Sequence, residues 1–172
     1  MKFLTNINDE KYTEFIKNHK HGNMMQAIEW SHIKNTWGAV RVAVVDENDN
    51  IIAAVQILTR QGLWYAPRGP ILDYNNTELL NFFLTNLKKF AKEKGAKMVK
   101  LDIPTAVKDE KLAVFKDIEV DRENNSLIKV FKENGYKHKG FSLDMSSTIQ
   151  PRFNTVTKLE QEVPDLFPKD TR

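Results

Sequence analysis

The 172-residue sequence contains no cysteine, only seven glycines and no long apolar run. Without cysteine the chain has no disulfide framework, zinc–thiolate site or thiol nucleophile. No apolar stretch approaches the roughly 20 residues that a membrane-spanning helix needs, and the first residues become polar too soon for a signal peptide. Glycine-rich phosphate-binding motifs and the Gly-x-Ser-x-Gly motif of many hydrolases are also absent. We therefore expect a cytoplasmic protein.

The composition is that of a folded, mildly basic domain. Hydrophobic residues make up 41% of the chain and charged residues 28%, and the formal net charge is +3. A chain of this length buries roughly 70% of the surface that its unfolded form exposes, which favours one well-filled core. The charge surplus is too small to indicate a nucleic-acid partner by itself.

Hydrophobic periodicity predicts a mixture of helices and strands along the chain. We expect helices over 9–19, about 25–37, about 76–94 and 126–134, and strands over 40–45, 51–58, 64–67 and 98–103. The first two strands flank a turn rich in Asp and Asn, so they are predicted to pair as an antiparallel hairpin. Residues 117–125 indicate a polar loop, and one or two further strands are expected between 136 and 149. This order predicts the α/β fold class, with a mixed sheet flanked by helices.

The first segment of functional character is Gln26-x-x-x-Trp30-x-x-x-Lys34-x-x-Trp37. On one continuous helix, spacings of four, four and three place these side chains on the same side. Two indoles beside an ammonium suit a ligand with a flat ring and a phosphate, since the rings stack and the lysine acts as a compact cation. The alternative is structural: both tryptophans anchor the core and Lys34 extends past them. Spacing alone favours that alternative.

The second segment is Tyr65-Ala66-Pro67-Arg68-Gly69-Pro70-x-x-Asp73. Arg68 lies between two prolines, which restrict the backbone. Gly69 precedes a proline and is expected to be extended or to adopt a conformation that other residues avoid. A stiff loop at a strand end is suited to present the guanidinium as a clamp for an oxyanion. The alternative is a rigid turn in which Arg68 and Asp73 pair with each other.

Two other groups of residues are weaker candidates. His19 and His21 lie beside a loop with no third ligand in view, so we expect surface residues and no metal site. Six lysines between positions 88 and 100 are predicted to form the solvated side of a helix and its exit loop. An electrostatic site for a polyanion is the alternative.

In their order along the chain, these motifs resemble the N-terminal part of the FemABX family, the peptidyltransferases that build the interpeptide branch of Gram-positive peptidoglycan. The resemblance covers nearly the whole chain. Tyr-x-Pro-Arg-Gly-Pro and Ile-Gln-Pro-Arg are its most specific parts. It is carried by the two segments above and by Lys100-Leu101-Asp102-Ile103-Pro104, Gly135-Tyr136 and Thr148-Ile149-Gln150-Pro151-Arg152.

The resemblance implies a GNAT-like (acetyltransferase-like) fold and an aminoacyltransferase activity. Members transfer an amino acid from aminoacyl-tRNA, with no further cofactor, to the stem-peptide amine of lipid II or UDP-MurNAc-pentapeptide. Residues 1–145 would form the precursor-binding domain, and 146–172 would cross toward a second GNAT-like domain that is missing, so we expect a truncated chain. Peripheral contact with the membrane face is also implied, and activity of the isolated domain is left open.

The resemblance also implies roles for single residues. Lys34 matches the family lysine that contacts the diphosphate of the precursor, and Trp37 matches the tryptophan beside it. Asp102 matches an aspartate proposed to assist the attacking amine, as a proton acceptor or by orienting the ammonium. Met98 falls where some relatives place a tyrosine near the precursor. The remaining substrate-binding candidates are Gln26, Trp30, Arg68 and Gly69, and for Arg68 a structural or interdomain role is the alternative.

Two competing functions belong to other classes. An acetyl-CoA-dependent GNAT N-acetyltransferase would bind pyrophosphate on an [Arg/Gln]-x-x-Gly-x-[Gly/Ala] loop before a helix, and no such run occurs in the sequence. A non-catalytic RNA- or protein-binding module would use the lysines between 88 and 100, and its binding of tRNA would depend steeply on salt.

Overall fold

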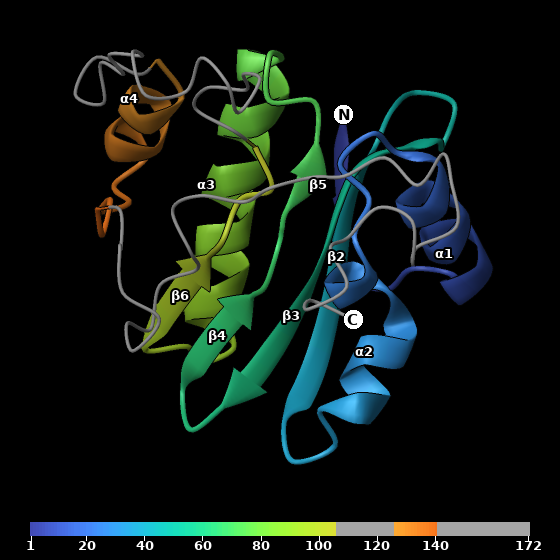
Figure 1. Ribbon diagram of the computed structural model, residues 1–172. Coiled ribbons are helices and arrows are strands. Elements are labelled where there is room, and N and C mark those ends of the chain that lie inside the picture. The colour runs from blue at the N-terminus through green and yellow to red at the C-terminus, as the bar shows by residue number, and fades with distance from the viewer. Residues whose placement is uncertain (106–125, 141–172) are drawn as a thin grey trace, which may run out of the picture. The chain divides into compact units, whose positions relative to one another are not determined.

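In the computed structural model the described residues are 1–105 and 126–140, which form a mixed β-sheet with helices packed against it (Figure 1). The chain divides into two compact units, residues 1–138 and 139–172, and the fold below is that of the first. Three predictions lie outside the described residues: the polar loop over 117–125, the strands beyond residue 140 and the crossover segment over 146–172.

Within residues 1–105 and 126–140 the sheet has six strands, in the order β1-β2-β3-β4-β6, with β5 paired to β3. Each pairing is antiparallel except that of β4 with β6, which is parallel. The prediction of an α/β fold with a mixed sheet is therefore confirmed. The strands are β1 Lys2–Leu4, β2 Gly38–Val45, β3 Ile51–Arg60, β4 Leu63–Ala66, β5 Ile71–Leu72 and β6 Met98–Leu101.

The predicted hairpin is formed by β2 and β3, which pair from Gly38 opposite Thr59 to Val45 opposite Ile51. A side chain closes its turn: Asp46 Oδ1 accepts hydrogen bonds from the backbone N–H groups of Asn48 and Asn50, each at 2.9 Å. Aspartate and asparagine favour such turns because their short side chains can bond the backbone two or more residues ahead.

Asparagine side chains begin the two longer helices. Asn8 Oδ1 accepts from Lys11 N–H at 2.9 Å, and Asn76 Oδ1 accepts from Leu79 N–H at 3.0 Å. Each bond satisfies one of the N–H groups that a helix leaves unpaired at its start. The helices are α1 Asp9–Asn18, the 3₁₀-helix η1 Met24–Gln26, α2 Ile28–Ile33, α3 Thr77–Glu93 and α4 Ser126–Glu133.

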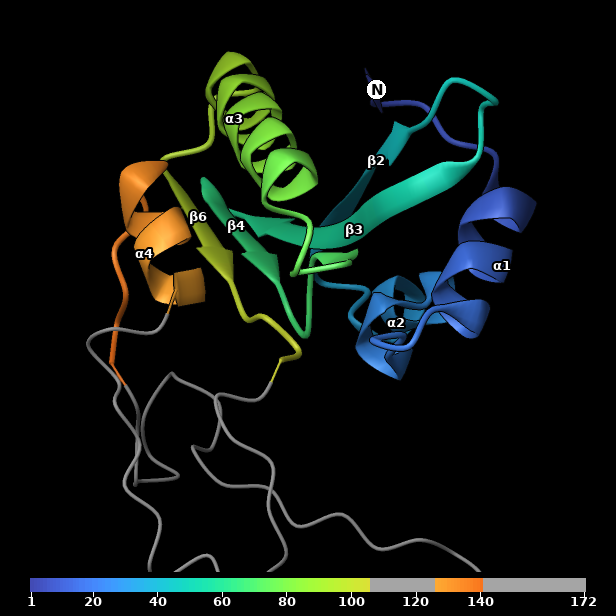
Figure 2. The same cartoon turned by 90° about the horizontal axis from the view of Figure 1, so that it is seen from above.

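The core consists of two apolar layers on opposite faces of the sheet. Strand side chains alternate between the faces, and β2, β3 and β5 contribute to both layers. Tyr12 and Ile16 of α1 pack with Ala43, Ala54 and Ile71 in the smaller layer. Figure 2 shows α3 on one side of the sheet and α1 and α2 on the other. The buried side chains that α3 contributes to the larger layer are Leu79, Leu80, Phe83, Leu84, Leu87 and Ala91.

Two features of the fold differ from the sequence prediction. The continuous helix expected over about 25–37 is wrong, because extended Ala27 (φ −68°, ψ 150°) separates η1 from α2, and α2 ends before Lys34. Strands β1 and β5 were not predicted. They contain three and two residues, too few to show a period, and each exists through pairing with a distant partner.

Candidate functional site

Trp30, Lys34 and Trp37 lie on α2 and the turn that follows it. Lys34 is the C-cap residue directly after α2, and its Nζ lies 5.3 Å from the centroid of the Trp30 ring. Both indoles are half-buried, whereas Lys34 is exposed. Neither tryptophan belongs to the two core layers, so the alternative in which they anchor the core is wrong. The arrangement is a cation held over an accessible aromatic surface.

Arg68 and Asp102 come together where β4 and β6 end. The two strands are parallel, so their carboxyl ends lie at the same edge, and Asp102 N–H donates to Ala66 C=O at 3.1 Å. Arg68 contacts the Asp102 carboxylate through two groups. Its backbone N–H donates to Asp102 Oδ2 at 3.3 Å, and its Nε lies 3.9 Å from the same oxygen. The alternative pairing of Arg68 with Asp73 is wrong, since Asp73 pairs with Lys20 at 3.2 Å.

The Asp102 carboxyl is 16% exposed. Burial raises the pKa of Asp102 above its ordinary value, against the lowering effects of the Arg68 guanidinium, the Arg68 N–H and the charge of Lys100. Tyr74 lies close by, and burial together with the Asp102 charge raises the pKa of its phenol. A desolvated carboxylate with increased proton affinity is suited to accept a proton from an ammonium or to orient it.

Cations and rings also cover the sheet between α2 and Asp102. Directly opposed residues of neighbouring strands point to the same face, and Tyr65 is opposed by Lys100, whose Nζ lies 4.9 Å from the Tyr65 ring centroid. Arg60 Cζ lies 5.7 Å from the Trp37 ring centroid. Three cation–ring pairs therefore run from α2 over β3 and β4 to β6. We call this surface the cation–ring row; it consists of Trp30, Lys34, Trp37, Arg60, Tyr65 and Lys100.

The sequence analysis missed Arg60, Tyr65 and Lys100 as site residues. Tyr65 is the first residue of the second predicted segment, and Lys100 lies two positions before Asp102, where strand alternation places side chains on the same face. That signal was present in the sequence. The register that sets Tyr65 opposite Lys100 was not, because it depends on the pairing of segments 35 positions apart.

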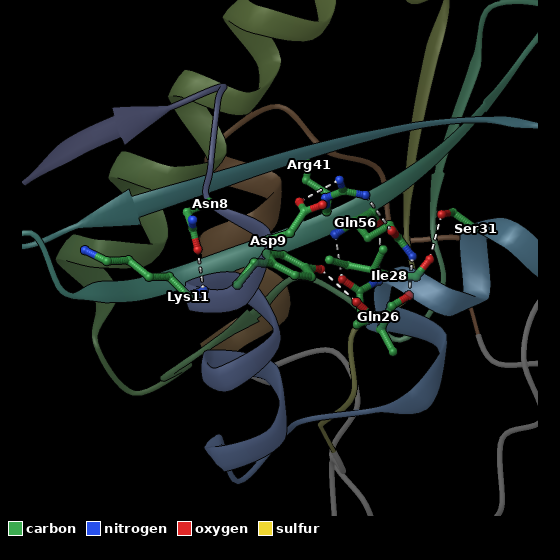
Figure 3. A network of polar contacts seen from close by, with 10 residues as sticks. Asn8, Asp9, Lys11, Gln26, Ile28, Ser31, Arg41 and Gln56 are labelled. Carbon is green, nitrogen blue, oxygen red and sulfur yellow. Dashed lines mark hydrogen bonds and ion pairs between the residues drawn. The ribbon is translucent and has the colours of Figure 1, made fainter.

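Gln26 and Gly69 pack against each other beneath this surface. Gln26 is 0% exposed, and its carboxamide hydrogen-bonds the backbone of Gln56 (Figure 3). It also donates to the backbone C=O of Pro67. A Cβ on Gly69 would lie 2.6–2.9 Å from three atoms of that carboxamide. Such burial leaves neither residue available to a substrate, and the expectation of direct contact is corrected on this ground. Of the two alternatives expected for Gly69, the conformation that other residues avoid is adopted by Arg68 instead, with φ 50°.

The remaining candidates have structural contacts. The rings of His19 and His21 lie 5.6 Å apart, and His21 packs against Tyr74 at 5.5 Å. Among residues 1–105 and 126–140, no three His, Asp or Glu side chains are arranged to hold a metal ion. Of the six lysines between 88 and 100, Lys88 donates to Asn134 C=O at 2.9 Å, where α4 ends, and Lys100 lies over Tyr65.

Comparison with known proteins identifies the family. The FemAB family model matches residues 7–172. The chain belongs to the FemAB family. Lipid II:glycine glycyltransferase of Staphylococcus epidermidis is 32% identical to this FemAB chain over 170 residues, which cover 94% of the chain and 37% of the relative. The protein of the same name from Staphylococcus aureus is 30% identical over an equal length. The FemAB chain thus spans little more than a third of these relatives.

Solved structures confirm the GNAT-like fold. FemX matches the FemAB chain with a TM-score of 0.63 and 30% identity, over 83% of this chain and 33% of FemX. The aminoglycoside 6'-N-acetyltransferase from Enterococcus faecium matches with a TM-score of 0.52 and 16% identity, over 81% and 87% of the two chains. In the described part of the FemAB chain, no helix combines the length and apolar character that crossing a bilayer requires.

Proposed function

We propose that residues 1–145 form the precursor-binding domain of a peptidoglycan aminoacyltransferase. The whole enzyme would transfer an amino acid from aminoacyl-tRNA to the stem-peptide amine of lipid II or UDP-MurNAc-pentapeptide. Membership of the FemAB family and relatives named for glycine transfer to lipid II support this reaction class. The observation that carries the binding assignment is the cation–ring row, which leads from Lys34 toward Asp102.

The row fits a ligand with a flat base, a diphosphate and a peptide. Lys34 is exposed and would contact the diphosphate as a point charge, while the half-buried indoles of Trp30 and Trp37 offer surfaces for a ring or sugar. Arg60 lies over Trp37 and adds a second cation to this end of the row. The stem peptide would then extend toward Arg68 and Asp102, so that the acceptor amine approaches the carboxylate.

The transfer itself needs little from a base. The amine nitrogen attacks the carbonyl carbon of the aminoacyl ester, an amide bond forms, and the C–O bond to the tRNA ribose breaks. The ammonium must first lose a proton, which Asp102 is placed to accept or to direct, and the departing ribose oxygen takes up a proton. Because the ester is already activated, positioning contributes more than strong base catalysis, and the proposal requires no cofactor.

The proposed donor and acceptor define the partners and the compartment. Aminoacyl-tRNA is a cytoplasmic substrate, so we place the enzyme in the cytoplasm, with peripheral contact at the membrane face if lipid II is the acceptor. A second GNAT-like domain in the native protein would complete the site for the tRNA-bound aminoacyl group. The relatives, which are longer than this chain, support such a second part.

Calorimetric titration of the chain with UDP-MurNAc-pentapeptide tests the proposal. Lys34→Ala is expected to weaken binding about tenfold, the loss of roughly 1.4 kcal/mol that one ammonium–phosphate contact supplies. Lys17→Ala is the matched control, since Lys17 is an exposed lysine on α1, outside the cation–ring row. Equal affinity of wild type and Lys34→Ala would contradict the proposal. Micromolar binding of acetyl-CoA instead would favour an acetyltransferase.

A further inference from the structure

Strand β3 pairs with two different strands along one edge. Residues 58–60 pair with β4 and residues 53–54 pair with β5, while the chain between β4 and β5 leaves the sheet as Pro67-Arg68-Gly69-Pro70. Residues 55–57 of β3 therefore face a gap on that edge. In an antiparallel sheet the N–H and C=O of one residue point to the same neighbour. At the gap, Gln56 is the residue whose N–H and C=O both point toward the missing neighbour.

The side chain of Gln26 fills this gap. Its Oε1 accepts from Gln56 N–H at 2.8 Å, and its Nε2 donates to Gln56 C=O at 3.1 Å. One acceptor and one donor are what a paired strand residue would offer to Gln56, so the carboxamide takes the place of the missing strand position. The second hydrogen of Nε2 goes to Pro67 C=O at 2.7 Å. The amide thus joins β3 to the segment that departs from it.

Close packing holds the Gln26 carboxamide, and separate hydrogen bonds hold the backbone at Gln26 and Ala27. Gly69 packs on the carboxamide so closely that any side chain at position 69 would displace it. Tyr12 Oη donates to the backbone C=O of Gln26 at 2.8 Å, and Gln56 Nε2 donates to the backbone C=O of Ala27 at 2.6 Å. These bonds fix the backbone immediately before α2, the helix that carries Trp30.

We propose that Gln26 is a positioning residue that sets the Arg68–Asp102 pair. Pro67 and Gly69, the two neighbours of Arg68, are both fixed by the Gln26 carboxamide, and Gly69 also forms an isolated antiparallel bridge with Asp102. Arg68 is thereby held with its N–H on the Asp102 carboxylate. Gln26 also directly precedes Ala27, the residue that caps α2. One buried side chain therefore links α2, which carries Trp30 of the cation–ring row, to the Arg68–Asp102 pair.

The test measures the pKa of the Asp102 carboxyl, which a loss of global stability alone does not change. In Gln26→Met the volume is retained and the three side-chain bonds are lost. Arg68 lowers the pKa of Asp102, so a misplaced Arg68 raises it, whereas Lys100 and Tyr74, the other groups near the carboxyl, are unaltered in the variant. We expect a higher Asp102 pKa in a carbon-13 titration, a shifted Arg68 amide resonance and about tenfold weaker binding of UDP-MurNAc-pentapeptide.

Tyr12→Phe is the matched control, because it removes a buried bond of the same network that does not reach Pro67 or Gly69. Both NMR signals should stay at their wild-type positions in this variant, even where its melting temperature falls as far as that of Gln26→Met. The measurement of UDP-MurNAc-pentapeptide binding rests on the proposed function, but the Asp102 titration and the Arg68 amide resonance do not. Absence of precursor binding by the wild type would therefore reject the function and leave this inference decided by the NMR signals.

Gly69→Ala provides a second, independent disturbance, since its methyl group pushes the carboxamide while Gln26 keeps all its donors and acceptors. It should raise the Asp102 pKa in the same direction as Gln26→Met. The inference is overturned if neither variant changes Asp102 and Arg68, or if Tyr12→Phe changes them equally. Failure of both variants to fold, with Tyr12→Phe folded, would assign Gln26 a purely structural role and overturn it as well.

Discussion

Arg68 supplies two groups to a single carboxylate oxygen. Its N–H and its guanidinium both face Asp102 Oδ2, and its backbone adopts the left-handed conformation with φ 50°. Non-glycine residues avoid this region, at a cost of order 1 kcal/mol, and where it occurs it is commonly associated with a function. The strain at Arg68 is offset by the fixed neighbours on both sides, Pro67 and Gly69.

Arg68→Ala is expected to destabilise the protein in a pH-dependent way. The guanidinium favours the ionised form of Asp102, so its removal raises the pKa of the folded-state carboxyl further above that of the unfolded chain. The loss of unfolding free energy should be about 1 kcal/mol at pH 7 and should shrink toward pH 3, where the carboxyl is protonated and gains nothing from Arg68. Urea denaturation across this range measures it.

Arg68→Lys is the control for this prediction, because it keeps a positive charge at the position. Its loss at pH 7 should be smaller than that of Arg68→Ala. A loss that is the same at pH 3 and pH 7 would show that Arg68 stabilises the loop by packing and not through the charge of Asp102.

At this scale the sequence predicted part of the site. The spacing and the family resemblance pointed to Lys34, Trp37 and Asp102 as functional candidates, and their contact with a substrate remains a prediction. For Arg68 the sequence offered two alternative partners, an external oxyanion or Asp73, and in the structure the partner is Asp102. A pairing across 34 positions depends on two strands lying side by side, which no local spacing encodes.

At the scale of elements, α3 is the helix that the sequence specified best. Its apolar residues recur at three and four positions and all face the larger core layer. The sequence predicted a start near residue 76, and of the neighbouring Asn75 and Asn76 the structure uses Asn76 as the cap. Asn75 instead donates twice to the Asp73 carboxylate, at 3.3 Å from both its backbone and its side chain.

Asn76→Ala is expected to lower the unfolding free energy by about 1 kcal/mol, the usual cost of removing an N-cap side chain. The substitution removes the hydrogen bond that Leu79 N–H donates to Asn76 Oδ1. Asn76→Ser retains an acceptor at the position and should lose much less. Thermal or urea denaturation of the three proteins checks the order, and equal stability of Asn76→Ala and wild type would contradict the capping role.

The elements that sequence reasoning missed depend on distant contacts. The spacing from Gln26 to Trp37 fits a helix, yet the chain breaks at Ala27 because the Gln26 side chain is drawn into the gap beside β3. Similarly, β5 has two residues and is a strand only because β3 offers it a partner. Local propensity is a weak guide where such tertiary contacts decide.

At the scale of the whole domain, His19 and His21 connect the end of α1 to the segment before α3. Burial is the main cause that holds the pKa of both imidazoles below the ordinary value, and Lys20 acts in the same direction while Asp73 opposes it. Each histidine also stacks on the other, and His21 contacts Tyr74. The folded domain therefore favours neutral imidazoles at this junction.

Stability is expected to fall as the pH is lowered from 7 to 5. In this range the unfolded chain binds more protons than the folded protein, since the folded pKa values lie below the unfolded ones. His19→Gln combined with His21→Gln should reduce this loss. Asp46 and Asp73, whose pKa values are also lowered, contribute only in the more acidic range around their ordinary value of 3.8. Urea denaturation at both pH values compares the proteins, and an identical loss in the double variant would refute the assignment.

The turn between β2 and β3 offers a practical route to these measurements. Asn48 bonds the Asp46 carboxylate through its backbone N–H, so its exposed side chain can be replaced without loss of that bond. The hairpin register puts this turn at the opposite end from Trp37, and β2 between them spans about 24 Å at the usual rise per residue. Since the sequence has no cysteine, Asn48→Cys would carry a unique thiol. A dye or spin label attached there would report on ligand capture at the far end of the hairpin without obstructing it.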